Sequence, residues 1–191
     1  MEDVRVDGNR RIDRVLSEGY LDDLTGRDIA DIRALRDEAD QEEADLSYLR
    51  RLLQGRLDLV QNEIERRSLG EPAPDDIVAH LTTVLTDEPR RRPNSHGSGR
   101  HRTVEPSNPG EHRRYVEQLV SNGLLMNLPS ASDAELDAAL LELRAEETAV
   151  SERRTAVQHV SDALGQEIGR RYREGEAEVS TLLDAQPNPN A

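Results

Sequence analysis

The chain has 191 residues, of which 34% are charged and 35% hydrophobic, and its net charge at pH 7 is −14. Only 2% of the residues are aromatic and none is cysteine, which argues against a thick globular core and excludes disulfides, thiol catalysis and Cys-ligated metals. The acidic balance disfavours direct binding to DNA or anionic membranes, because phosphate binding depends on Lys and Arg, and it favours a basic protein partner.

The spacing of apolar residues predicts an all-α protein with two long helices. The predicted segments are, in chain order, a short helix in residues 1–25, a coiled-coil helix at 26–67, a short helix and a disordered linker at 68–111, a short helix at 112–131, a second coiled-coil helix at 132–176 and a loose tail at 177–191. Ser132 and Glu135 form a capping-box pattern at the start of the second long helix. The linker is rich in Pro, Gly, Ser and Arg, which is typical of disordered segments.

No run reaches the roughly 18 apolar residues of a membrane span, and the first residues lack the apolar stretch of a signal peptide. We therefore expect a cytoplasmic protein.

The two long helices are copies of one another. A shift of 104 residues pairs Ala30 with Ala134 and Glu63 with Glu167, and no gap is needed over nearly sixty positions. This is an internal duplication. Neither helix can bury its apolar stripe alone, so the simplest architecture packs one copy against the other as a two-helix coiled coil. The linker permits either direction, and we expect the antiparallel one, which places a two-fold axis at mid-helix.

Five polar positions are identical in the two copies, although neighbouring apolar positions have changed. Both copies read E-x3-S-x2-R-x3-Q-x3-D, and the ten residues are Glu43, Ser47, Arg50, Gln54, Asp58, Glu147, Ser151, Arg154, Gln158 and Asp162. At about 100° per residue, the five side chains of a copy project within roughly 80° of one another and form one stripe beside the apolar seam. Ser and Gln have no special merit on an exposed helix, so their retention favours ligand binding over a charged flank.

The side-chain chemistry of the motif narrows the ligand. Arginine pairs bidentately with guanine O6 and N7 or with phosphate, and carboxylates complement the N1–H and N2–H2 edge of guanine. Two equivalent stripes suit a symmetric ligand. The residues alone therefore indicate a symmetric, anionic ligand that contains a purine.

The doubled motif resembles that of the RsiG-type anti-sigma factors of actinomycetes. The resemblance implies an antiparallel coiled coil in which both stripes, all ten residues above, bind cyclic di-GMP as a dimer. It further implies a cytoplasmic regulator that sequesters a WhiG-like sporulation sigma factor when the nucleotide is bound, and so represses transcription of the sigma factor's regulon. Because one chain contains both copies, we expect a monomer before partner binding.

Two other functions compete with this interpretation. A coiled-coil scaffold protein without a nucleotide ligand would explain the helices but not the retained Ser and Gln. An enzyme acting on the nucleotide would need a metal site or an activated water, and the sequence shows no metal-ligand spacing, phosphate loop or nucleophile motif. We therefore expect neither catalysis nor a metal cofactor.

Overall fold

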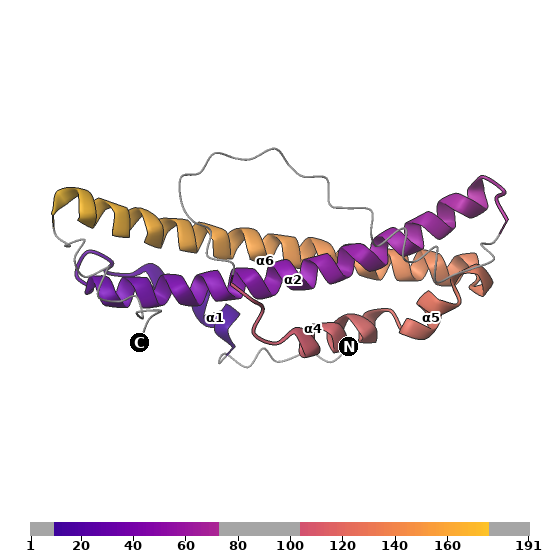
Figure 1. Cartoon of the computed structure of the whole chain (residues 1–191), viewed down its shortest axis with the longest axis horizontal. Helices are drawn as coiled ribbons and strands as arrows, with labels where there is room; N and C mark the ends of the chain where they lie inside the picture. Colours follow the sequence, from indigo (N-terminus) through magenta and orange to yellow (C-terminus); the bar gives the residue numbers. More distant parts are fainter. Residues whose placement is uncertain (1–9, 73–103, 176–191) are drawn as a thin grey trace, which may run out of the picture. The chain divides into compact units, whose positions relative to one another are not determined.

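The computed structural model describes residues 10–72 and 104–175, and every regular element in these ranges is a helix. The elements are α1 (Arg11–Val15), the 3-10 helix η1 (Glu18–Leu21), α2 (Ile29–Ser68), α4 (Pro109–Leu119), α5 (Asn122–Met126), the 3-10 helix η2 (Leu128–Ser130) and α6 (Asp133–Glu174) (Figure 1). The predicted all-α class is confirmed. Within the predicted segment 68–111, the short helix that we expected at 75–88 and most of the linker lie outside the described residues, as does the predicted tail except for its start.

The chain divides into two compact units. Unit 1 comprises residues 1–43 and 154–191, and unit 2 comprises residues 44–153. Both long helices contribute to both units, and in each unit the segments of α2 and α6 lie side by side (Figure 1). Each unit is thus built from half of each long helix together with short helices that pack against them.

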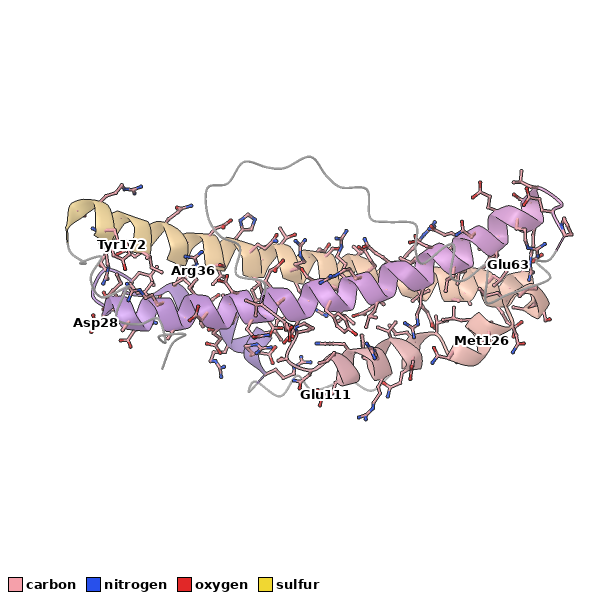
Figure 2. The ribbon with its side chains drawn as sticks, in the orientation of Figure 1. Asp28, Arg36, Glu63, Glu111, Met126 and Tyr172 are labelled. Carbon is pink, nitrogen blue, oxygen red and sulfur yellow. The ribbon has the colours of Figure 1, made fainter. Side chains whose placement is uncertain are left out.

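The long helices are antiparallel within each unit, as predicted. As the residue number rises along α2, the number of its partner on α6 falls. The pairs are Arg33–Tyr172 and Glu43–Arg154 in unit 1, and Arg50–Glu147 and Arg67–Asp133 in unit 2. Figure 2 shows Tyr172, near the end of α6, close to Asp28 at the start of α2.

A strict seven-residue repeat forms the buried seam on both helices, which is the pattern of a coiled coil. Ten residues in this repeat are buried, and nine of them are fully or almost fully enclosed at 0% exposure, Leu46 being the exception at 6%. They are Ile32, Ala39, Leu46, Leu53 and Val60 on α2, and Leu136, Leu143, Val150, Val157 and Leu164 on α6. The 104-residue shift superimposes one list on the other. The two copies therefore have different aliphatic residues at equivalent seam positions, but all of these residues are buried. A core tolerates exchanges among aliphatic side chains when total volume is kept.

The N-terminal segment packs on α2 within unit 1. The short helix that the sequence predicts in residues 9–24, with a break at Gly19, is two short elements in the structure: α1 ends at Val15, and a 3-10 turn that contains Gly19 follows. Val15 is fully buried, and the Tyr20 hydroxyl donates a hydrogen bond of 2.8 Å to the Leu35 carbonyl on α2. Arg11 Nε also donates to Glu42, at 2.7 Å.

The short helices after the linker pack within unit 2. Pro109 occupies the first turn of α4, so the helix begins three residues earlier than the expected 112, in a segment we assigned to the linker. The helix also stops sooner, because Val120 adopts an extended backbone and Ser121 caps a separate helix, α5, by accepting a hydrogen bond from the Leu124 amide. Val116 is fully buried.

The starts of the two long helices are set by side-chain caps. The Ser132 hydroxyl accepts a hydrogen bond from the Glu135 amide at 3.3 Å, and the Glu135 carboxylate accepts one from the Ser132 amide at 2.7 Å, so the predicted capping box is formed. In α2 the Asp28 carboxylate accepts from the Ile29 amide at 2.8 Å, which moves the helix start to residue 29 from the expected 26. At the other end of α2, Gly70 takes a left-handed conformation with φ of 69°.

Candidate functional site

In unit 2, four motif residues form one hydrogen-bonded cluster between α2 and α6. Arg50 Nε donates to the Glu147 carboxylate and to the Ser151 hydroxyl, both at 2.9 Å. The Ser151 hydroxyl donates to the same carboxylate oxygen at 3.0 Å, and Gln54 Nε2 reaches it at 3.4 Å. Glu147 is therefore the common acceptor of the cluster.

In unit 1, the other motif glutamate plays the same part. Arg154 Nε donates to the Glu43 carboxylate at 2.8 Å, and Gln158 Nε2 donates to the same oxygen at 3.0 Å. All three side chains are half-buried. The two units therefore contain equivalent clusters, and in each one the glutamate comes from one motif copy while the arginine and glutamine come from the other.

The remaining three motif residues are Ser47, Asp58 and Asp162. Ser47 is half-buried on α2. Asp58 and Asp162 are exposed, and neither carboxylate is hydrogen-bonded or ion-paired to any residue in the two described ranges. An unpaired, solvated carboxylate next to an Arg–Glu pair is available to accept hydrogen bonds from a ligand.

An open hollow of about 510 Å³ adjoins the cluster in unit 2. It is lined by Arg50, Gln54, Leu57, Asp58, Gln61 and Glu147. Its volume falls in the range of small-molecule pockets, roughly 300–1,000 Å³. The sequence prediction named four of the six lining residues and omitted Leu57 and Gln61 from the site.

The donors and acceptors in this hollow indicate what it can bind. Arg50 uses only Nε for its hydrogen bonds to described residues, so its terminal nitrogens retain donor capacity. Asp58 and Glu147 together outnumber this one cation, so a simple inorganic anion is a poor match for the lining. A ligand with both an anionic or acceptor face and N–H donors suits the hollow better, and a guanine nucleotide has both.

Arg67, which is not a motif residue, anchors the C-terminal end of α2 through hydrogen bonds. In unit 2, Arg67 Nη2 donates to the carbonyls of Leu128 and Ala131 at 2.8 and 2.7 Å, and its Nε donates to Glu63 at 2.7 Å. Figure 2 shows Glu63 near the C-terminal end of α2. Hydrogen bonds from Arg66, followed by those from Arg67, hold the pKa of the buried Glu63 below its ordinary value.

In unit 1, Arg171 fastens the end of α6 in the same manner. Its Nη2 donates to the carbonyls of Leu24 and Thr25 at 2.6 and 3.2 Å, and its Nε donates to Glu167 at 2.9 Å. Hydrogen bonds from Arg170 and Arg171 lower the pKa of Glu167 to about 2. These residues match Glu63, Arg66 and Arg67 under the 104-residue shift, so the shared ends of the repeat are explained by folding alone.

One buried acidic residue beside the first motif copy was not anticipated. The Asp45 carboxylate accepts hydrogen bonds of 2.6 Å from both the amide and the hydroxyl of Ser107, which lies two residues before the start of α4. His112 Nε2 lies 3.9 Å from the same carboxylate, and the His112 ring is 6.1 Å from that of Tyr48. Position 149, the counterpart of Asp45, is alanine, so this contact belongs to unit 2 alone. The sequence contained a signal for this contact, because the first copy has an acidic residue at a helix position where the second copy has an apolar one.

Two kinds of feature are absent from residues 10–72 and 104–175. These residues contain no group of three or more His, Asp or Glu side chains that could hold a metal ion. Among them, no helix has the length and apolar character needed to cross a membrane.

One comparison with known proteins found a match, to a part of the chain. Residues 18–85 match a family described as RsiG-like, so the resemblance noted in the sequence is confirmed over this stretch, which contains the whole first motif copy. The second copy, on α6, lies outside the match and is related to the first by the internal duplication. No curated protein matches the sequence. The RsiG-like match indicates an anti-sigma factor role, with a sigma factor as partner.

Proposed function

We propose that this RsiG-like protein is an anti-sigma factor that binds cyclic di-GMP through its two motif clusters and then sequesters a WhiG-like sporulation sigma factor. One observation carries the proposal. Each unit contains the same half-buried cluster, in which a glutamate of one motif copy accepts hydrogen bonds from the arginine and glutamine of the other copy. Duplicated polar clusters of the same composition suit a ligand that presents the same groups twice.

Each cluster can contribute recognition of a guanine. The terminal nitrogens of Arg50 or Arg154 donate to guanine O6 and N7 or to a phosphate oxygen, and Asp58 or Asp162 accepts from the guanine N1–H and N2–H2 groups. Because Arg50 and Arg154 are half-buried, their hydrogen bonds to the ligand form in a setting less screened than bulk water. A dimer of cyclic di-GMP supplies guanines and phosphates for both clusters.

The charge of the chain supports a sigma factor as the partner. A net charge of −14 steers the protein toward basic surfaces, and sigma factors present basic surfaces to DNA. An anionic nucleotide held by the acidic protein can contact both proteins, so the ligand raises their mutual affinity only while it is bound. We therefore propose ligand-dependent repression of the sigma factor's regulon by a cytoplasmic protein that is monomeric before binding, is not an enzyme and makes no direct contact with DNA.

The competing function is a structural coiled coil. The Arg50–Glu147 and Arg154–Glu43 ion pairs join α2 to α6 in the absence of any ligand, so a purely structural protein could also use them. Such pairs, with a quarter to a third of each arginine exposed, stabilise a fold by roughly 1 kcal/mol or less. The two functions differ in whether the protein binds the nucleotide.

Calorimetric titration of the purified chain with cyclic di-GMP tests the proposal, with GTP and cyclic di-AMP as control ligands. We expect saturable binding of cyclic di-GMP alone, and loss of at least tenfold in affinity when Arg50 and Arg154 are both replaced by alanine. Arg51 and Arg153 supply the matched control, because each is the exposed neighbour of a motif arginine and lies outside both clusters. Replacing both by alanine makes the same charge change and should leave the affinity within about twofold.

The sigma factor is the second arm of the test. A pull-down of a WhiG-like sigma factor should succeed with cyclic di-GMP and fail without it, and the Arg50→Ala, Arg154→Ala double variant should fail in both conditions. A chain that captures the sigma factor equally well with and without nucleotide would refute ligand dependence. A chain that ignores cyclic di-GMP even with the sigma factor present would be left with the structural function.

A further inference from the structure

In unit 2 the polar stripe continues beyond the motif. Gln61 lies seven residues after the motif glutamine, Gln54, and three residues after Asp58. Seven residues make almost two helical turns, so the side chains of Gln54 and Gln61 project within about 20° of one another. Gln61 also lines the hollow together with Arg50 and Asp58. A sixth polar side chain therefore extends the stripe on the far side of the aspartate.

The amide group of Gln61 has unused hydrogen-bonding capacity. The residue is half-buried, and its amide forms no hydrogen bond with any other residue in the ranges 10–72 and 104–175. A glutamine amide carries two N–H donors and a carbonyl acceptor. Within the described chain these groups face the hollow without a protein partner, so a ligand in the hollow can hydrogen-bond to them.

The spacing of Asp58 and Gln61 matches one edge of guanine. Side chains three residues apart on a helix have Cβ atoms about 5–6 Å apart, so both can contact the same flat ring. That edge presents the N1–H and N2–H2 donors and the O6 acceptor. The Asp58 carboxylate can only accept, which leaves an amide N–H of Gln61 for O6. Arg50 lies eight residues from Asp58, about 12 Å along the helix axis, and is better placed for a phosphate or for another edge of the base.

Unit 1 supplies a donor at the equivalent place from the other helix. The counterpart of Gln61 is Gly165, three residues after Asp162, and a Cβ atom on Gly165 would stand 3.6 Å from Arg36 Cζ and 3.8 Å from Arg36 Nε. Arg36 lies on α2, and its Nε is 3.8 Å from the Asp40 carboxylate, which is too long for a hydrogen bond. The counterpart of Arg36 in unit 2, position 140, is leucine. The two units thus place N–H donors beside the motif aspartate by different residues.

From these observations we propose that Gln61 and Arg36 determine base specificity, each by donating an N–H to guanine O6 while the neighbouring motif aspartate binds the N1–H and N2–H2 groups. The inference rests on the proposed function, since it names the ligand atom that two further residues recognise. Both clusters act on the same nucleotide dimer, and each contributes one donor. An aspartate alone does not contact O6, whereas an aspartate with a donor beside it reads the whole edge.

Combined changes in the protein and in the ligand test this contact. The probes are cyclic di-GMP and its analogue with sulfur in place of O6, because sulfur is a weak hydrogen-bond acceptor. In titrations of the full chain, Gln61→Ala and Arg36→Ala should each lower the affinity for cyclic di-GMP by about fivefold, as loss of one hydrogen bond does. The unaltered chain should prefer cyclic di-GMP to the sulfur analogue, and the double variant should bind both about equally.

Matched control variants and a rescue variant accompany these titrations. Gln118→Ala and Arg173→Ala remove exposed side chains of the same types, one from unit 2 and one from unit 1, and should leave the affinity and the preference unchanged. In the Arg36→Ala background, Gly165→Gln should restore the affinity and the preference, because it builds the amide of unit 2 into unit 1. The three atoms nearest to the added Cβ all belong to Arg36, so its removal makes room for the new side chain. Thermal melting checks that each variant is folded.

The outcomes separate this inference from the function on which it rests. If the unaltered chain does not bind cyclic di-GMP, the proposed function fails and the assignment of O6 fails with it. If the unaltered chain binds but the double variant keeps the full preference over the sulfur analogue, the function stands and the O6 contacts are overturned. If the preference is lost in the double variant but Gly165→Gln does not restore it to the Arg36→Ala variant, the assignment to Arg36 in unit 1 is overturned.

Discussion

Arg171 should be the most important single ionic side chain for the stability of unit 1. It is 7% exposed and donates to the carbonyls of Leu24 and Thr25 as well as to Glu167. A hydrogen bond from a charged donor contributes about 1.5 kcal/mol or more, so the two carbonyl contacts together stabilise the fold by about 3 kcal/mol. The Glu167 contact adds little to this figure, because Glu167 keeps Arg170 as a partner when Arg171 is removed.

Urea denaturation followed by circular dichroism measures the effect. Arg171→Ala should lower the free energy of unfolding by about 3 kcal/mol, which corresponds to a fall in Tm of about 6–12 °C for a chain of this size. Arg170→Ala is the matched control: Arg170 binds the same glutamate at 2.9 Å but reaches neither carbonyl, and its side chain is 30% exposed. Its loss should cost less than about 1 kcal/mol. Equal losses for the two variants would refute the argument that the carbonyl contacts carry the stability.

Three further predictions concern other parts of the described chain. The pKa of Glu167 is lowered to about 2, so its ion pairs stabilise the fold above the ordinary carboxyl pKa, and this contribution is lost as the pH falls toward 2. The variant Glu167→Gln lacks this carboxylate, so unfolding titrations should show a smaller loss of stability in acid than for the unaltered chain. Asp45→Ala should speed hydrogen exchange in α4 and leave the part of α6 in unit 1 unchanged, because Asp45 is hydrogen-bonded to Ser107, two residues before the start of α4. Leu53→Ala should lower the free energy of unfolding by about 2–5 kcal/mol because Leu53 is fully buried. Leu141→Ala, at a position 72% exposed, should change the free energy of unfolding by less than about 0.5 kcal/mol. A similar cost for both variants would contradict the placement of the seam.

The helical framework could be predicted because it depends on local and repeated signals. The apolar repeat from Ile32 to Val60 reappears from Leu136 to Leu164, and a repeated stripe of this kind has few ways to be buried other than against its own copy. Helix starts were less accurate. The cap of α2 lies at Asp28, since that side chain accepts the first amide hydrogen bond, and several other residues nearby could have served equally well by residue type.

The contacts of the short helices could not be predicted in the same way. Asp45 meets Ser107 across 62 residues, and neither residue has a repeated partner that would mark the pair. Pro109 begins α4 within a stretch whose composition resembles the linker. In both cases tertiary packing determines the outcome, and a single sequence carries no periodic signal of it.

The hydrogen bonds inside the clusters explain why the motif residues are identical in the two copies while the apolar seam residues differ. A seam position such as Leu46, with valine as its counterpart at 150, needs only an aliphatic side chain of suitable volume. The glutamate, arginine and glutamine of each motif have partners on the other copy, because Glu43 is bonded to Arg154 and Gln158 and not to the arginine of its own copy. Loss of one whole motif copy therefore removes the glutamate from one cluster and the arginine and glutamine from the other. After the duplication neither copy was redundant, and this dependence holds for any ligand that the clusters bind.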